Sequence, residues 1–118
     1  MKQDFRSLLV WQKAIAFVTD IYRATQTFPK DEQYGLTSQL RRAAVSIPSN
    51  IAKGQARLTR GEFRQFLGHA KGSLAEVETQ LVIAQNLGYL KDPDVLFDRL
   101  HEVARILNGL LNSLTTDN

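Results

Sequence analysis

Helical periodicity governs nearly the whole of this 118-residue chain. Apolar residues recur every three or four positions, the spacing that places them on one face of an α-helix. No segment rich in Val, Ile and Thr shows the strict alternation of a half-buried strand, so we expect no β-sheet. The periodic segments cover residues 7–27, 31–56, 60–87 and 93–114.

Caps and helix breakers separate these segments. Phe28-Pro29 ends the first, because the residue before a proline is disfavoured in the helical region. Thr59-Arg-Gly-Glu62 has the sequence of a capping box, in which the threonine hydroxyl and the glutamate reach each other's backbone amides. Gly88 indicates a helix stop, and Asp92-Pro93 is a cap followed by a first-turn proline. Four helices of about 20 residues with short connections predict one all-α domain, an antiparallel up-down-up-down four-helix bundle.

Each helix should contribute one apolar face to the core. For the first helix we assign Leu8, Trp11, Ile15, Val18, Tyr22 and Thr25 to this face, and for the second Leu36, Leu40, Ala43, Ala44, Ile47 and Ile51. Pro48 falls inside the second helix, where it removes a hydrogen bond and crowds the carbonyl four residues earlier. Because the faces keep their phase across this proline, we predict a kink and not a break.

Composition and cysteine content exclude several classes of protein. Hydrophobic residues make up 43% and charged residues 23%, ordinary values for a soluble globular protein. The absence of cysteine rules out disulfides, thiolate nucleophiles and cysteine-bound metals. The N-terminal segment is too polar for a secretory signal, and no apolar run approaches the ~20 residues that span a bilayer. We therefore expect a cytoplasmic protein that does not interact with membranes.

The sequence lacks a recognisable catalytic or metal-binding pattern. Di-iron bundles need a Glu-x-x-His on each of two helices, whereas here only His101 follows an acid, Asp98, by three positions. His69 has no such carboxylate, and no glycine-rich phosphate loop or nucleophile motif is present. We predict that the protein is not an enzyme and uses no metal or cofactor; an enzyme with an unrecognised site is the most distant alternative.

Positive charge is concentrated in the middle of the chain. Between Arg41 and Lys71 there are seven cations and one acid, Glu62, a balance of 7 − 1 = +6, while the whole chain carries only +3. Such separation creates a local positive field that attracts polyanions. Arg41 is turned towards the flank of its helix. The remaining six cations, which we call the basic ridge, are the candidate phosphate contacts: Arg42, Lys53, Arg57, Arg60, Arg64 and Lys71.

Two interpretations of the basic ridge remain open. It can bind RNA or DNA through phosphates, with little sequence preference and strong salt dependence. Alternatively, the protein is an interaction scaffold whose ridge docks an acidic protein or a neighbouring protomer. No aromatic residue interleaves the cations, so we do not expect base stacking on the ridge.

Glycines inside the third helix and apolar residues outside the predicted core faces indicate self-association. Gly68 and Gly72 each cost the third helix up to about 1 kcal/mol relative to alanine, which a close approach by another backbone would offset. Further apolar residues lie beside the predicted core faces: Leu9, Val10, Val82 and Ile83. A single bundle buries about one face per helix, so these positions predict a homo-oligomer.

Several short segments resemble one known family. The most specific is Gln39–Ala52, with the sequence QLRRAAVSIPSNIA. On this segment the chain is similar to the four-helix-bundle family first recognised as products of intervening sequences in bacterial 23S rRNA genes, which includes the accessory variability proteins of diversity-generating retroelements. The resemblance covers roughly residues 5–114. Other matching positions are Val10–Ala14, Phe28-Pro29, Tyr34–Leu36, Gly54, Glu62-Phe63, Phe66-Leu67, Ala70, Gly72–Leu74 and Glu76.

The resemblance implies a four-helix bundle that assembles into a ring-like homopentamer. In the retroelement branch it also implies a basic surface that binds nucleic acid and an association with a reverse transcriptase. One position departs from the family, which usually has a glutamate between Ala52 and Gly54, where this chain has Lys53. The replacement puts a base on the outward face, and it either strengthens a nucleic-acid surface or alters a subunit interface.

Overall fold

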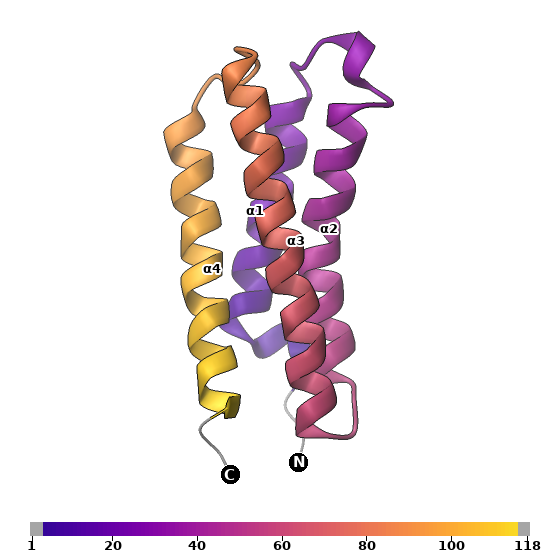
Figure 1. Ribbon diagram of the computed structural model, residues 1–118, viewed down its shortest axis with the longest axis vertical. Coiled ribbons are helices and arrows are strands. Elements are labelled where there is room, and N and C mark those ends of the chain that lie inside the picture. Colours follow the sequence, from indigo (N-terminus) through magenta and orange to yellow (C-terminus); the bar gives the residue numbers. More distant parts are fainter. Residues whose placement is uncertain (1–3, 116–118) are drawn as a thin grey trace.

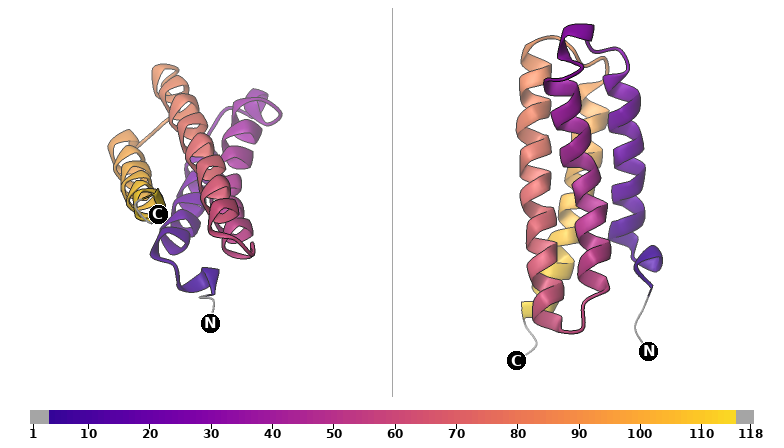
Figure 2. Two further views of the ribbon diagram at one scale, coloured as in Figure 1. Left: turned by 60° about the horizontal axis from the view of Figure 1, so that its bottom comes forward. Right: turned by 90° about the vertical axis from the view of Figure 1, so that its right-hand side faces the viewer.

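The computed structural model describes residues 4–115, and within this range the protein is an all-α bundle with no strand. Its helices are α1 (Leu9–Thr25), α2 (Leu36–Gln55), α3 (Arg60–Asn86) and α4 (Pro93–Thr115). Successive helices run in opposite directions along an axis of 48 Å (Figure 1). Each helix packs against two neighbours, so that α3 lies between α2 and α4, and α1 closes the ring (Figures 1 and 2). The predicted four-helix bundle is confirmed.

Two helices begin later than predicted, because short 3-10 turns precede them. In η1 (Phe5–Ser7), the Asp4 carboxylate accepts a hydrogen bond from the Arg6 amide at 3.0 Å, and α1 starts only at Leu9. In η2 (Lys30–Glu32), the Glu32 carboxylate accepts from the Leu36 amide at 3.1 Å. Glu32 therefore caps α2 from outside instead of belonging to it.

Helix α2 continues through Pro48. The proline is buried, and the Asn50 side chain next to it donates to the Ser46 carbonyl at 2.8 Å. Proline lacks the amide hydrogen that would bond to the Ala44 carbonyl, whereas the Ser46 carbonyl gains a side-chain donor. The helix is not broken, as predicted, whereas the kink in its axis stays a prediction.

The core consists of one apolar face from each helix. Its largest fully buried side chains are Phe17, Ile21, Leu40, Ile47, Ile51, Leu67, Leu81, Leu100 and Leu107. All six residues that we assigned to the core face of the second helix are buried. The buried apolar residues of α3 are Leu67, Ala70, Leu74, Val77, Leu81 and Ala84, and those of α4 are Leu96, Leu100, Val103, Leu107 and Leu111.

The core face of α1 lies one position along the helix from the predicted one, except at Thr25, which is buried as expected. The buried residues of α1 are Val10, Ala14, Phe17, Ile21 and Thr25. Ile15 and Tyr22, which we expected inside, are 39% and 40% exposed. One residue corresponds to a rotation of 100°, so α1 carries two apolar faces, and the second lies half-exposed beside α2.

Candidate nucleic-acid interface

The turn between α2 and α3 is fixed by a side-chain cap. The Thr59 hydroxyl accepts a hydrogen bond from the Glu62 amide at 3.1 Å and donates to the Glu62 carboxylate at 3.0 Å. The threonine part of the predicted capping box is confirmed, and the glutamate bonds to the threonine hydroxyl. This cap sets the positions of Arg57 before the turn and Arg60 at the start of α3.

A close approach of the two helices sits directly beside this turn. A Cβ atom on Gly54 would lie 2.9 Å from Phe66 Cβ and 3.0 Å from Phe63 Cδ1, closer than carbon atoms pack. Only glycine fits here, which lets the end of α2 rest on the first turns of α3. The aromatic ring of Phe66 in turn supports Arg57, whose guanidinium carbon is 4.5 Å from the ring centroid.

Four of the six predicted phosphate contacts gather at this end of the bundle. Lys53 lies in the last turn of α2, and Arg57 lies in the connection that follows it. Arg60 and Arg64 lie one turn apart at the start of α3 and share a helix face. All four side chains are exposed. Residues 53–64 include one acid, Glu62, so the local balance is 4 − 1 = +3. We refer to these four cations as the basic end.

The other two predicted contacts, Arg42 and Lys71, are exposed but lie apart from the basic end and from each other. Arg42 lines a groove between α2 and α3 together with Glu76. Lys71 lines a groove between α3 and α4 together with Glu78. Because α3 separates the two grooves (Figure 1), the basic ridge is not one continuous surface. Each of these cations also has an acid in its own groove, which weakens the local field.

Arg41, which we left out of the ridge, is bound to α1. Its Nε donates to Thr25 Oγ1 at 2.8 Å, and a terminal nitrogen donates to the Tyr22 carbonyl at 3.3 Å. The guanidinium carbon also lies 4.6 Å from the Tyr22 ring centroid. These contacts hold α1 against α2, so this arginine has a structural role.

A tyrosine that the sequence did not point to stands beside Arg42. Tyr34 precedes α2, is 90% exposed and lines the same groove, whose volume is about 450 Å³. Contrary to our expectation, Phe63 and Phe66 stand among the cations in the sequence, but both are half-buried. The turn before α2 adds the exposed ring of Tyr34 to the groove that Arg42 lines. No periodic signal marks this placement, because Tyr34 lies in the turn before α2 and not in the helix.

Acidic side chains outside the basic ridge form ion pairs that connect one helix to another. Asp20 of α1 binds Arg99 of α4, and this hydrogen bond raises the pKa of the Arg99 guanidinium. Lys13 and Glu102 make a second pair between the same helices at 3.4 Å. Such exposed pairs contribute little stability, typically below about 1 kcal/mol each. They do, however, cancel charge on the α1–α4 side of the bundle.

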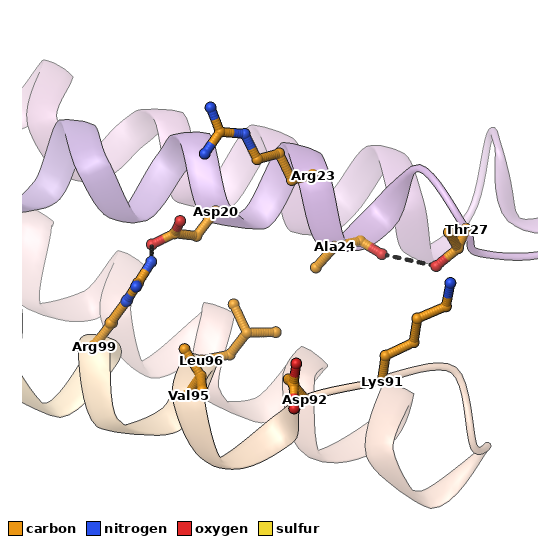
Figure 3. Close-up of a pocket in the computed structure, with 9 residues that line it drawn as sticks. All are labelled: Asp20, Arg23, Ala24, Thr27, Lys91, Asp92, Val95, Leu96 and Arg99. Atoms are coloured by element: carbon orange, nitrogen blue, oxygen red, sulfur yellow. Dashed lines mark hydrogen bonds and ion pairs between the residues drawn. The ribbon is translucent and has the colours of Figure 1, made fainter.

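A separate cavity of about 300 Å³ lies between the end of α1 and the start of α4 (Figure 3). The Asp20–Arg99 pair closes one end, and Lys91 reaches towards Thr27 at the other. The lining contains three cations and two acids, so its charges nearly balance and it lacks the field of a polyanion site. The lining residues are Asp20, Arg23, Ala24, Thr27, Lys91, Asp92, Val95, Leu96 and Arg99.

Among residues 4–115, no three His, Cys, Asp or Glu side chains are close enough to share a metal ion. His101 instead lies 3.3 Å from a Glu78 carboxylate oxygen, and His69 packs edge-on against Phe66. The same part of the chain contains no helix with the length and apolar character needed to cross a membrane.

Comparison with known proteins assigns the chain to a family. The sequence model of the 23S rRNA-intervening sequence proteins matches residues 6–109. The chain belongs to this family. No curated protein matches it. The crystal structure of a protein of unknown function from the S23 ribosomal protein family of Bacteroides thetaiotaomicron VPI-5482 has a similar fold, with a TM-score of 0.78 and 19% identity. The match covers 87% of this chain and 98% of the other.

Proposed function

We propose that this 23S rRNA-intervening sequence protein is a non-enzymatic, cytoplasmic, homo-oligomeric bundle that binds RNA or DNA electrostatically in an accessory role. The observation that carries the proposal is the basic end, where four exposed cations surround one tight turn. The single acid among them, Glu62, is bonded to Thr59. Long, exposed cations bind phosphates by displacing counterions.

The arrangement favours phosphate contacts over base recognition at the basic end. Arg57 is held over the Phe66 ring, so one guanidinium is partly ordered before a ligand arrives. Lys53 stands where the resemblance to the family leads us to expect a glutamate, and this replacement changes the local charge by two units in favour of phosphate. Arg42 and Lys71 would extend the contacts along the grooves on either side of α3.

Self-association would multiply these contacts. An apolar groove between η1, α1 and α2 is lined by the second face of α1, including Trp11, Ile15 and Val18. Val82 and Ile83 form another exposed aliphatic pair on α3. Within the protomer nothing lies within 4 Å of where a Cβ would stand on Gly72, so this face is open to a neighbouring subunit. The subunit number of five and a reverse transcriptase as partner rest on the resemblance alone.

One observation favours the rival function of a protein-interaction scaffold. Leu58 lies at the tip of the α2–α3 turn, next to Arg57, and is 96% exposed. A protruding leucine among cations suits an acidic protein with an apolar pocket better than it suits a phosphate backbone. A Leu58→Ser variant separates the two functions, since it should weaken docking of a protein and leave phosphate binding unchanged.

The proposal is tested by charge reversal with a matched control. In Arg57→Glu/Arg60→Glu, two cations of the basic end become acids, which changes the net charge from +3 to −1. In the control, Arg23→Glu/Lys91→Glu, the same change of −4 is made at the other end of the bundle, on side chains without a hydrogen-bond or ion-pair partner in the described residues. Fluorescence anisotropy with a labelled single strand and a labelled duplex gives the affinities.

We expect the first variant to bind about tenfold more weakly or worse at about 50 mM salt, and the control to stay close to wild type. Light scattering on the same samples checks that both variants keep the subunit number of the wild type. Equal losses in both variants would show that only net charge matters, and absence of binding by the wild type would leave the scaffold function.

A further inference from the structure

The groove between α2 and α3 brings together an aromatic ring, a cation and hydrogen-bond acceptors. Tyr34 stands at one end with most of its ring accessible, and Arg42 lies further along α2. Glu76 faces them from α3, and Gln39 lies on α2. The volume of about 450 Å³ is within the range of small-molecule sites.

A buried amide holds the acceptors of this groove in place. Gln80 is only 6% exposed, and its Nε2 lies 3.5 Å from both Gln39 Oε1 and Glu76 Oε2. Its own Oε1 is buried and has no hydrogen-bond partner within residues 4–115. Among the residues that line the groove, Glu76 is the one carboxylate, and an ionised carboxylate only accepts hydrogen bonds. A ligand that presents N–H donors would complement it.

We infer that this groove binds one unstacked guanine nucleotide of a single strand. Tyr34 stacks on the base, Glu76 accepts hydrogen bonds from the N1–H and N2–H groups of the base edge, and Arg42 binds the attached phosphate. Gln80 is a positioning residue that holds Gln39 and Glu76. The inference rests on the proposed function and names the part of a strand that this second surface recognises.

Guanine fits the acceptors best, because it alone among the common bases carries two adjacent N–H donors on its Watson–Crick edge. A carboxylate accepts such a parallel pair with both oxygens, which gives geometric specificity. Aromatic side chains are the usual platforms for bases that are splayed out of a single strand. The α2 lining extends from Ser38 to Ser46, about 12 Å along the helix axis, which leaves room for a base and its phosphate.

An arginine of a partner protein offers similar parallel donors, and it is the main competing occupant. Arg42 lines the same groove and would repel a second guanidinium. A nucleotide brings a negative phosphate to Arg42 and neutral donors to Glu76, so it matches both charges. The groove therefore favours a nucleotide.

The inference is tested by titrating GMP, IMP and AMP into the isotopically labelled full-length protein and following amide chemical shifts. IMP keeps N1–H but lacks the N2 amino group, and AMP presents no parallel pair. We expect GMP to bind about tenfold more tightly than AMP, with IMP between them and the largest shifts along the groove. Tyr34→Leu should weaken GMP binding about tenfold or more through lost stacking, while Tyr34→Phe retains it. Glu76→Gln should remove the preference for GMP over AMP.

The outcomes separate this inference from the proposed function. Equal affinities for GMP and AMP, shifts outside the groove, or full binding by Tyr34→Leu would overturn the guanine site, even if salt-dependent binding of strands persists. Tighter binding of an arginine-containing peptide than of GMP would overturn it as well. Because Tyr34 is 90% exposed, its substitution leaves the core intact, and circular dichroism of each variant checks this.

Discussion

Replacing Gly54 by alanine should destabilise the bundle, although alanine is the better helix former. The added Cβ would meet Phe66 Cβ at 2.9 Å and the Phe63 carbonyl oxygen at 3.2 Å, atoms that cannot move without their backbone. Overpacking of this kind costs roughly 1–3 kcal/mol, whereas the gain in helix propensity is at most about 1 kcal/mol. We therefore expect a net loss of about 1–2 kcal/mol, which corresponds to a melting temperature lower by roughly 4–8 °C.

The assay is urea unfolding followed by circular dichroism at one fixed protein concentration, because association shifts apparent stability. Gly109→Ala is the matched control, since this glycine lies inside α4 and nothing would lie within 4 Å of its Cβ. The control should gain up to about 1 kcal/mol. A Gly54→Ala protein as stable as the wild type would refute the close approach of α2 and α3. Because Phe66 supports Arg57, the same variant should also weaken nucleic-acid binding.

Three further predictions concern assembly, titration and capping. If another subunit packs closely on Gly72, Gly72→Ala should lower the subunit number measured by analytical ultracentrifugation at a given dilution. A variant with unchanged assembly and higher stability would mean that the Gly72 face of α3 is exposed to solvent. Burial and the hydrogen bond to Glu32 raise the pKa of the Tyr89 phenol, so its stabilisation is present below about pH 10 and is lost as pH rises through the raised pKa. Tyr89→Phe should abolish that pH dependence, and a phenol that titrates like free tyrosine would contradict it. Thr59→Ala should cost about 1 kcal/mol in urea unfolding, whereas Thr79→Ala in mid-helix should cost nothing.

The four-helix fold could be predicted from the sequence because the signals that mark each helix are local. Periodicity, proline and cap residues locate helices without knowledge of their neighbours. The core face of α1 did not follow, because Phe17 and Trp11 belong to two apolar faces with the same spacing, 100° apart. Only packing against α2 and α4 decides which face is buried. The start of α2 was also misplaced, since Glu32 caps it across a 3-10 turn that resembles the first turn of a helix.

Only part of the candidate site could be predicted from the sequence. Helical spacing correctly placed all six cations on exposed surface. Helical spacing did not show that Arg42 and Lys71 lie in grooves on opposite sides of α3. That arrangement depends on which helix packs against each side of α3. Glu76 and Glu78 are two residues apart, about 200° around the helix, and line opposite grooves. The position of Tyr34 beside Arg42 depends on the turn before α2, which periodicity does not describe.

The central claim is that the basic end binds phosphates, and the salt dependence of strand affinity tests it most directly. For a single strand, the logarithm of the binding constant falls by about 0.7 per phosphate contact for each unit of log salt concentration. The four cations of the basic end predict a slope near −3 per protomer between about 50 and 200 mM salt, and all six predict about −4. A slope near zero, or no measurable binding at the lower salt, would contradict the account.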